Sequence, residues 1–194
     1  MSEKNILREG SLEFIFADGL MPAKFDETRF YKKFASALPS GKGVDFIAAA
    51  EDSLILIEVK NCEGYERENE WRTLVNQKRG DEETFDVEIA RKVASTLSCL
   101  VGANTYPDKQ GDDEPADELK PYFEMLTKMR KGKVHLKVYF FLEGDFATKT
   151  RTKDMIWKRI EEKIKEYFKG WLSCTVKIVD SAKTPYRYFT VRKL

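Results

Sequence analysis

Residues 44–60 constrain the fold of this chain more than any other stretch. Residues 44–50 and 54–60 are both rich in β-branched and apolar side chains, and residues 51–53 form a short polar break between them. Two such arms predict antiparallel strands that are joined by a tight turn. Because both faces of this hairpin are apolar over most of its length, we expect other elements to cover it on both sides.

The register of the hairpin decides which side chains meet at its open end. A two-residue turn at Glu51 and Asp52, or a four-residue turn around them, places Asp45 opposite Glu58. A three-residue loop shifts the pairing by one place, and because Glu-Asp is not the Asn-Gly pair that tight turns favour, this register also remains open. In the first register Asp45, Glu58 and Lys60 share one face.

The charges at this open end have two interpretations. Carboxylates directly across an antiparallel pair have Cβ atoms about 5 Å apart and repel each other, and a hard cation such as Mg²⁺ would relieve this repulsion through oxygen ligands. Lys60 supplies either a counter-charge or a group that orients a water. The alternative is a surface salt bridge among Asp45, Glu58 and Lys60, which contributes little stability. That alternative exposes Leu54 and Leu56, so we favour the site.

The composition excludes several functional classes. The chain has 194 residues with 42% hydrophobic content, enough to bury the core of one α/β domain, and its net charge of +1 gives no global attraction to nucleic acid or to anionic membranes. Three widely spaced cysteines and a single histidine argue against a zinc site. Because no signal core and no apolar run of ~20 residues is present, we expect a cytoplasmic protein without a membrane partner.

Further helices and strands are expected around the hairpin from the spacing of apolar residues. The strand at 12–16 is expected at the edge of the main sheet, and Asp26 is expected to cap the first helix. The predicted helices are 26–38, 87–101 and 152–171, the strands are 12–16, 135–142, 174–179 and 186–191, the partly helical excursion is 66–83, and the acidic loop is 107–121.

Four residues outside the hairpin are secondary candidates for the site. Glu27 lies three residues before Phe30 on the inward stripe of the first helix, and it either points toward the hairpin or only complements the helix dipole. Lys92 on the second long helix, and Lys42 just before the hairpin, are candidates for substrate binding, although such residues usually form a solvated face. Gly43 has no side chain and leaves room for a ligand near the backbone.

The order of helix, Asp-bearing strand, Glu-x-Lys strand, helix and strand over residues 26–142 resembles the PD-(D/E)xK, or restriction-endonuclease-like, nuclease superfamily. The sequence from 57 to 61, together with Gly64 and Trp71, is similar to the nuclease-related domain (NERD) branch. Glu58 follows Asp45 by thirteen residues. The chain departs from the family pattern because no proline precedes Asp45, and because the glutamine or tyrosine often found on the second core helix has no clear counterpart.

This resemblance implies an α/β fold, a three-layer sandwich with a mixed central sheet flanked by helices. It implies one domain over residues 1–194, with a core at 26–142 and the segment 152–194 packed onto it. It also implies a metal-dependent nuclease that acts on phosphodiester bonds, with DNA as the nucleic-acid partner and with RNA and a homodimer left open.

The resemblance assigns roles to individual residues. Asp45 and Glu58 correspond to the ligands of Mg²⁺ or Mn²⁺, with the Val59 carbonyl as a further ligand. Lys60 corresponds to the catalytic lysine that helps to generate or position the attacking hydroxide, and Glu27 corresponds to the acid on the first helix.

Two alternatives to an active nuclease remain. One is a catalytically inactive nuclease-like module that binds DNA ends or a protein partner, favoured by the near-neutral charge and the acidic loop. The other is a purely structural hairpin. Basic residues near the end of the chain, with Tyr186 and Tyr188 among them, give weak support for a nucleic-acid surface, because most charge runs are simply solvent-facing.

Overall fold

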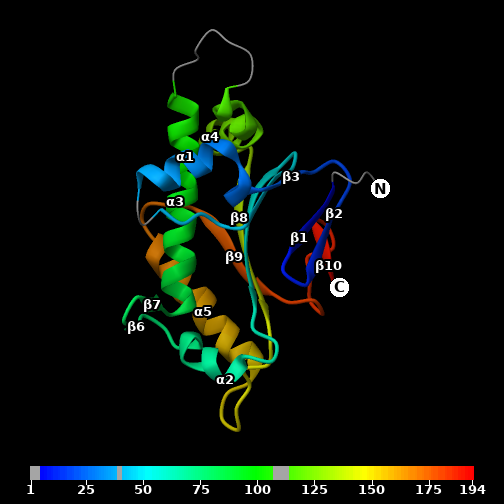
Figure 1. Cartoon of the computed structure of the whole chain (residues 1–194), viewed down its shortest axis with the longest axis vertical. Helices are drawn as coiled ribbons and strands as arrows, with labels where there is room; N and C mark the ends of the chain where they lie inside the picture. The colour runs from blue at the N-terminus through cyan, green and yellow to red at the C-terminus, as the bar shows by residue number, and fades with distance from the viewer. Residues whose placement is uncertain (1–4, 39–40, 107–113) are drawn as a thin grey trace.

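A computed structural model describes residues 5–38, 41–106 and 114–194 and shows a mixed α/β protein (Figure 1). Its centre is a five-stranded mixed sheet in the order β3-β4-β5-β8-β9. The first three strands pair antiparallel, and the last two join in parallel. The strands are β3 (Met21–Lys24), β4 (Phe46–Ala49), β5 (Ser53–Asn61), β8 (His135–Glu143) and β9 (Cys174–Val179).

The predicted hairpin is confirmed in the first of the two registers. Phe46 pairs with Ile57 and Ala49 with Leu54, and the Ala50 N–H donates to the Ser53 carbonyl at 2.8 Å to close the turn. β5 has nine residues and β4 has four, so the end of β5 extends beyond the ladder with β4.

Helices cover one face of the central sheet (Figure 1). The apolar stripes that predicted the three long helices pack against this face, as Ile89 and Val93 of the second helix and Ile160 of the third show. A fourth helix was not predicted, because it directly follows the acidic residues assigned to a loop. The helices are α1 (Arg29–Ala37), α3 (Phe85–Thr105), α4 (Lys120–Arg130) and α5 (Lys153–Phe168).

A second sheet covers the other face of the central sheet, so the expected flanking helices are present on one side only (Figure 1). Phe14 lies at the centre of this contact, with its ring centroid 4.9 Å from that of Phe46 and 5.1 Å from that of Phe141. The segment 12–16 therefore forms a strand as predicted, but not at the edge of the main sheet. The second sheet has the order β1-β2-β10 and consists of β1 (Ile6–Glu9), β2 (Leu12–Phe16) and β10 (Phe189–Lys193).

The segment between β5 and α3 is partly helical, as predicted, and also contains a small hairpin. Gly80 has a φ of +59° at the turn of this hairpin, where a side chain would be strained. The elements are α2 (Glu66–Asn69), the 3-10 helix η3 (Glu70–Thr73), β6 (Lys78–Arg79) and β7 (Glu82–Glu83). They place the β6–β7 hairpin beside the first turns of α3.

Three smaller expectations have separate outcomes. Asp26 does not cap α1, because it lies in the 3-10 helix η2 (Phe25–Glu27) and α1 begins only at Arg29. The predicted acidic loop lies outside the described residues at 107–113, and its later part forms the 3-10 helix η4 (Pro115–Leu119). Across the described ranges, none of the helices has the length and apolar character needed to cross a membrane.

Candidate functional site

The candidate site begins where β4 and β5 separate. Here the Val44 N–H leaves the ladder and donates to the Thr96 hydroxyl on α3 at 3.0 Å. The Asp45 carboxylate replaces the missing strand partner, since its Oδ2 accepts the Val59 N–H at 2.6 Å. The N–H and C=O of a strand residue point to the same edge of the strand, so the Val59 carbonyl faces the same gap as Asp45.

Glu58 lies across from Asp45 and is the most buried charged group of the site. Its side chain is 0% exposed, against 14% for Asp45 and 12% for Lys92. The Lys92 ammonium contacts Glu58 Oε1 and lies 3.7 Å from Asp45 Oδ1, while the Lys60 ammonium lies 3.2 Å from Glu58 Oε1. Glu58 Oε2 is buried without a hydrogen-bond donor anywhere in the described ranges, a situation that costs about 1–3 kcal/mol or more for a charged group.

The charges continue from Lys60 into an alternating network. Lys60 also binds Glu88 Oε1 of α3 at 2.9 Å, and Glu88 in turn pairs with Arg72 of η3. The Arg72 guanidinium stacks over the Phe85 ring at 4.5 Å. Together with Asp45, Glu58 and Lys92 these residues give three carboxylates and three cations, so the network is balanced within itself.

Burial and neighbouring charges shift the pKa values of the central residues. Burial raises the pKa of Glu58 to about 7, with a further increase from Asp45 and an opposing effect of Lys92 and Lys60. Burial also raises the pKa of Asp45, against the Lys92 charge and the Val59 N–H. For Lys60, burial lowers the pKa, but the Glu58 and Glu88 carboxylates outweigh it and leave the pKa above its ordinary value. Glu58 therefore titrates near neutral pH while Lys60 stays an ammonium.

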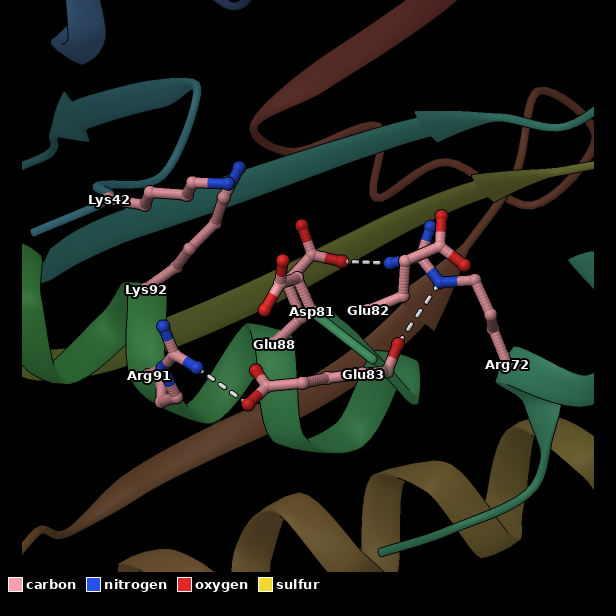
Figure 2. A pocket seen from close by; sticks show the side chains of 8 residues that line it. All are labelled: Lys42, Arg72, Asp81, Glu82, Glu83, Glu88, Arg91 and Lys92. Carbon is pink, nitrogen blue, oxygen red and sulfur yellow. Dashed lines mark hydrogen bonds and ion pairs between the residues drawn. The ribbon is translucent and has the colours of Figure 1, made fainter. Parts of the chain in front are cut away.

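A cavity of about 240 Å³ adjoins this network (Figure 2). Lys42 and Lys92 lie at one end of it, and the β6–β7 hairpin contributes acidic side chains (Figure 2). Arg91 is held by Glu83 at 2.6 Å. The lining residues are Lys42, Arg72, Asp81, Glu82, Glu83, Glu88, Arg91 and Lys92.

The structure brings most of the predicted site residues together, but not Glu27. Asp45, Glu58 and Lys60 converge, and Lys92 joins them directly. The Glu27 carboxylate pairs with Lys24 at 2.9 Å and is 61% exposed. The expectation that Glu27 points toward the hairpin is wrong, because it ends a separate 3-10 turn instead of starting the inward stripe of α1.

The expected open space at Gly43 is also absent. A Cβ atom there would lie 2.6 Å from Cε1 of Phe25 and 2.9 Å from Cε2 of Tyr31. The Tyr31 hydroxyl also accepts the Gly43 N–H at 2.9 Å. Glycine is therefore required by aromatic packing, and the prediction of room for a ligand is wrong.

Three residues near the site were not assigned to it from the sequence. Asp26 has a buried Oδ1 without a hydrogen bond among the described residues, and its pKa is raised by burial and then by the Asp45 charge. Glu88 precedes Lys92 by four residues, a helical spacing that could have placed both on one face. Arg72 lies in the 3-10 helix η3, in a polar segment whose sequence has no such spacing signal.

The oxygen atoms present here suit a hard divalent cation. Asp45, Glu58 and the Val59 carbonyl offer oxygen ligands in one gap, and the donor-free Glu58 Oε2 is a buried negative atom that lacks a partner. Within the described ranges, no group of three or more His, Cys, Asp or Glu side chains is arranged to hold a metal ion. Mg²⁺ keeps several of its waters in proteins, so two carboxylates and one carbonyl are sufficient ligands.

Fold and site together define a mixed α/β protein with a buried carboxylate and ammonium centre at the end of β5. Residues 28–192 match a family described as "Family of unknown function (DUF6661)", and the chain belongs to this family. Comparisons with curated proteins and with solved structures found no match.

Proposed function

We propose that the protein is a metal-dependent nuclease with a restriction-endonuclease-like fold, and that it hydrolyses phosphodiester bonds in DNA. One observation carries this proposal. Asp45 and the fully buried Glu58 converge at the end of β5, next to the Lys60 ammonium, and one Glu58 oxygen has no donor within the described structure. Buried carboxylates with perturbed pKa values beside a cavity are a recognised mark of functional sites.

The proposed roles follow from the contacts of each residue. Asp45, Glu58 and the Val59 carbonyl would hold Mg²⁺ or Mn²⁺, which supplies Lewis-acid stabilisation of charge on the phosphoryl oxygens when it is bound. Lys60, fixed between Glu58 and Glu88, stays protonated and is placed to bind a phosphate oxygen or to orient the attacking water. Lys42 lines the adjoining cavity and can bind the neighbouring phosphate.

A catalytically inactive binding or scaffold module is the second candidate. The observation in its favour is the balance of three carboxylates by three cations, which gives the network internal partners without any metal. Such a module would keep the fold and lose the affinity for divalent cations.

Cleavage assays test the enzyme directly. We expect the purified protein to cut linear, supercoiled or single-stranded DNA with Mg²⁺ or Mn²⁺, and Lys60→Ala to lower the rate by about 10²-fold or more, as the loss of a positioned catalytic group does. Lys158→Ala is the matched control, because Lys158 is exposed on α5 and lies 4.0 Å from the exposed Glu162, far from any site residue in the sequence. Absence of cleavage of every DNA form with both metals would contradict the proposal.

A further inference from the structure

We propose that Lys92 couples the binding of a divalent cation to the binding of a phosphodiester. In this proposal, which rests on the proposed function, the cation displaces the Lys92 ammonium from Asp45 and Glu58, and the released ammonium joins Lys42 as a phosphate-binding group in the adjoining cavity. Lys92 is thus a positioning residue that moves. It pairs with Asp45 and Glu58 before the cation binds, and it binds the phosphodiester afterwards.

Lys92 and a cation need the same two carboxylates, Asp45 and Glu58. The Lys92 ammonium contacts Glu58 Oε1 and lies 3.7 Å from Asp45 Oδ1, so it bridges the two carboxylates that offer oxygen ligands. Two positive groups between the same two carboxylates repel each other strongly in a buried site. The cation therefore binds only if Lys92 moves away.

When a cation binds, Lys92 is the lysine that moves and Lys60 stays in place. Lys60 has a further partner, since it binds Glu88 Oε1 at 2.9 Å and keeps that contact when a cation takes Glu58. Asp45 and Glu58 are the two carboxylates that Lys92 contacts in the described structure, so a cation removes both of its partners. The four-carbon stem of lysine has freely rotating bonds that allow the ammonium to swing.

The released Lys92 ammonium can move into the adjoining cavity. Lys92 already lines the cavity of about 240 Å³ that Lys42 also lines (Figure 2). Lys42 is exposed and makes no ion pair in the described parts of the chain, whereas Arg91 is held by Glu83 at 2.6 Å. With Lys92 released, the ammonium groups of Lys42 and Lys92 both face this cavity. The anion they would bind there is a phosphodiester, the substrate group of the proposed function.

Coupling of this kind is reciprocal. If the cation raises the affinity for the phosphodiester by a given factor, the phosphodiester raises the affinity for the cation by the same factor, and couplings between sites are typically about 5–150-fold. We therefore expect the displacement of Lys92 to tighten the binding of each ligand by about fivefold or more.

Calorimetry with Mn²⁺ and a phosphorothioate dithymidine dinucleotide, which resists hydrolysis, measures this coupling without any turnover. In the wild-type protein we expect each ligand to lower the Kd of the other by about fivefold or more. Lys92→Met removes the competing ammonium, so we expect tighter Mn²⁺ binding in the absence of the dinucleotide and a coupling factor well below the wild-type value, because only the direct attraction between cation and phosphodiester remains. Lys158→Met is the matched control, because it removes an exposed cation of α5 that does not line the cavity, and it should keep the wild-type coupling.

The outcomes separate this inference from the proposed function. If wild-type protein binds Mn²⁺ and Lys92→Met leaves both the Mn²⁺ affinity and the coupling unchanged, the inference is overturned and the metal site stands. If neither protein binds Mn²⁺, both are overturned. Lys92→Gln retains a hydrogen-bond donor to Glu58 without the charge, so it decides the matter if Lys92→Met does not fold.

Discussion

Glu58 combines full burial, a nearby Asp45 carboxylate and two lysine partners on a single oxygen. Its pKa of about 7 stands above the ordinary value of 4.5, so between these pH values the folded protein binds a proton that the unfolded chain has released. The contribution of Glu58 to stability therefore falls as the pH rises from about 4.5 to 7, and the full cost of its ionisation is present above pH 7. A bound cation would offset this cost.

The pKa of Glu58 predicts the pH dependence of cation binding. A cation needs the ionised carboxylate, and with a pKa of about 7 the ionised fraction of Glu58 rises about tenfold between pH 6 and pH 8. We expect the Mn²⁺ affinity measured by calorimetry to increase by a similar factor over that range. Glu58→Gln should bind Mn²⁺ weakly and without this dependence. A wild-type affinity that is constant from pH 6 to pH 8 would contradict the assignment of Glu58 as a ligand.

At the scale of elements, α3 holds the chain that carries Asp45. The fully buried Thr96 hydroxyl accepts the Val44 N–H at 3.0 Å, one residue before Asp45. This bond lets the chain leave the ladder without an unsatisfied N–H, and it places the Asp45 carboxylate against the Val59 N–H.

This bond gives a prediction for stability. Thr96→Val keeps the shape of the side chain but removes the acceptor, so the buried Val44 N–H loses its partner and the free energy of unfolding should fall by about 1–3 kcal/mol. The control is Ser98→Ala, which removes an exposed hydroxyl on the same helix that donates to the Ala94 carbonyl, with an expected change within about 0.5 kcal/mol. Urea denaturation measures both. Equal effects of the two substitutions would mean that the Thr96 bond does not hold this junction.

The elements also show how far the sequence could predict the structure. Two apolar arms around the polar break at residues 51–53 predicted the hairpin, but because both of its faces are apolar the sequence left two registers open, and the structure has the one that brings Asp45 together with Glu58. The 3-10 turn before α1 was not predictable, since a short break in helical phase leaves the apolar spacing almost unchanged. Because of this break, the helical spacing indicated Glu27 as the acid near the site. In the structure it is the neighbouring Asp26 whose pKa the Asp45 charge helps to raise, while Glu27 pairs with Lys24.

Contacts between distant elements were harder to predict than the elements themselves. The strand at 12–16 has the same alternation whether it extends the main sheet or packs across it. The tertiary contact of Phe14 with Phe46 distinguishes the two arrangements, and the local sequence pattern does not predict it. The link from Glu88 to Arg72 likewise joins α3 to the 3-10 helix η3. Sequence patterns report the face that a residue occupies, and they do not report its partner.

At the scale of the whole molecule, two layers bury β5 and leave its carboxyl end for the site. Helices cover one face and the second sheet covers the other, and the side chains from Leu54 to Ile57 are fully buried (Figure 1). A strand held on both faces fixes Glu58 and the Val59 carbonyl rigidly, and such a scaffold suits a preorganised site. With a net charge of only +1, any attraction to nucleic acid must come from local groups such as Lys42 and Lys92.

A crystal structure of the protein soaked in Mn²⁺, with the anomalous signal of manganese recorded, tests the proposed metal site most directly. We expect one strong peak about 2.0–2.3 Å from a carboxylate oxygen of Asp45, a carboxylate oxygen of Glu58 and the Val59 carbonyl. The Lys92 ammonium should then lie away from Glu58. A map with no peak between Asp45 and Glu58, and with Lys92 still bridging them, would contradict the account.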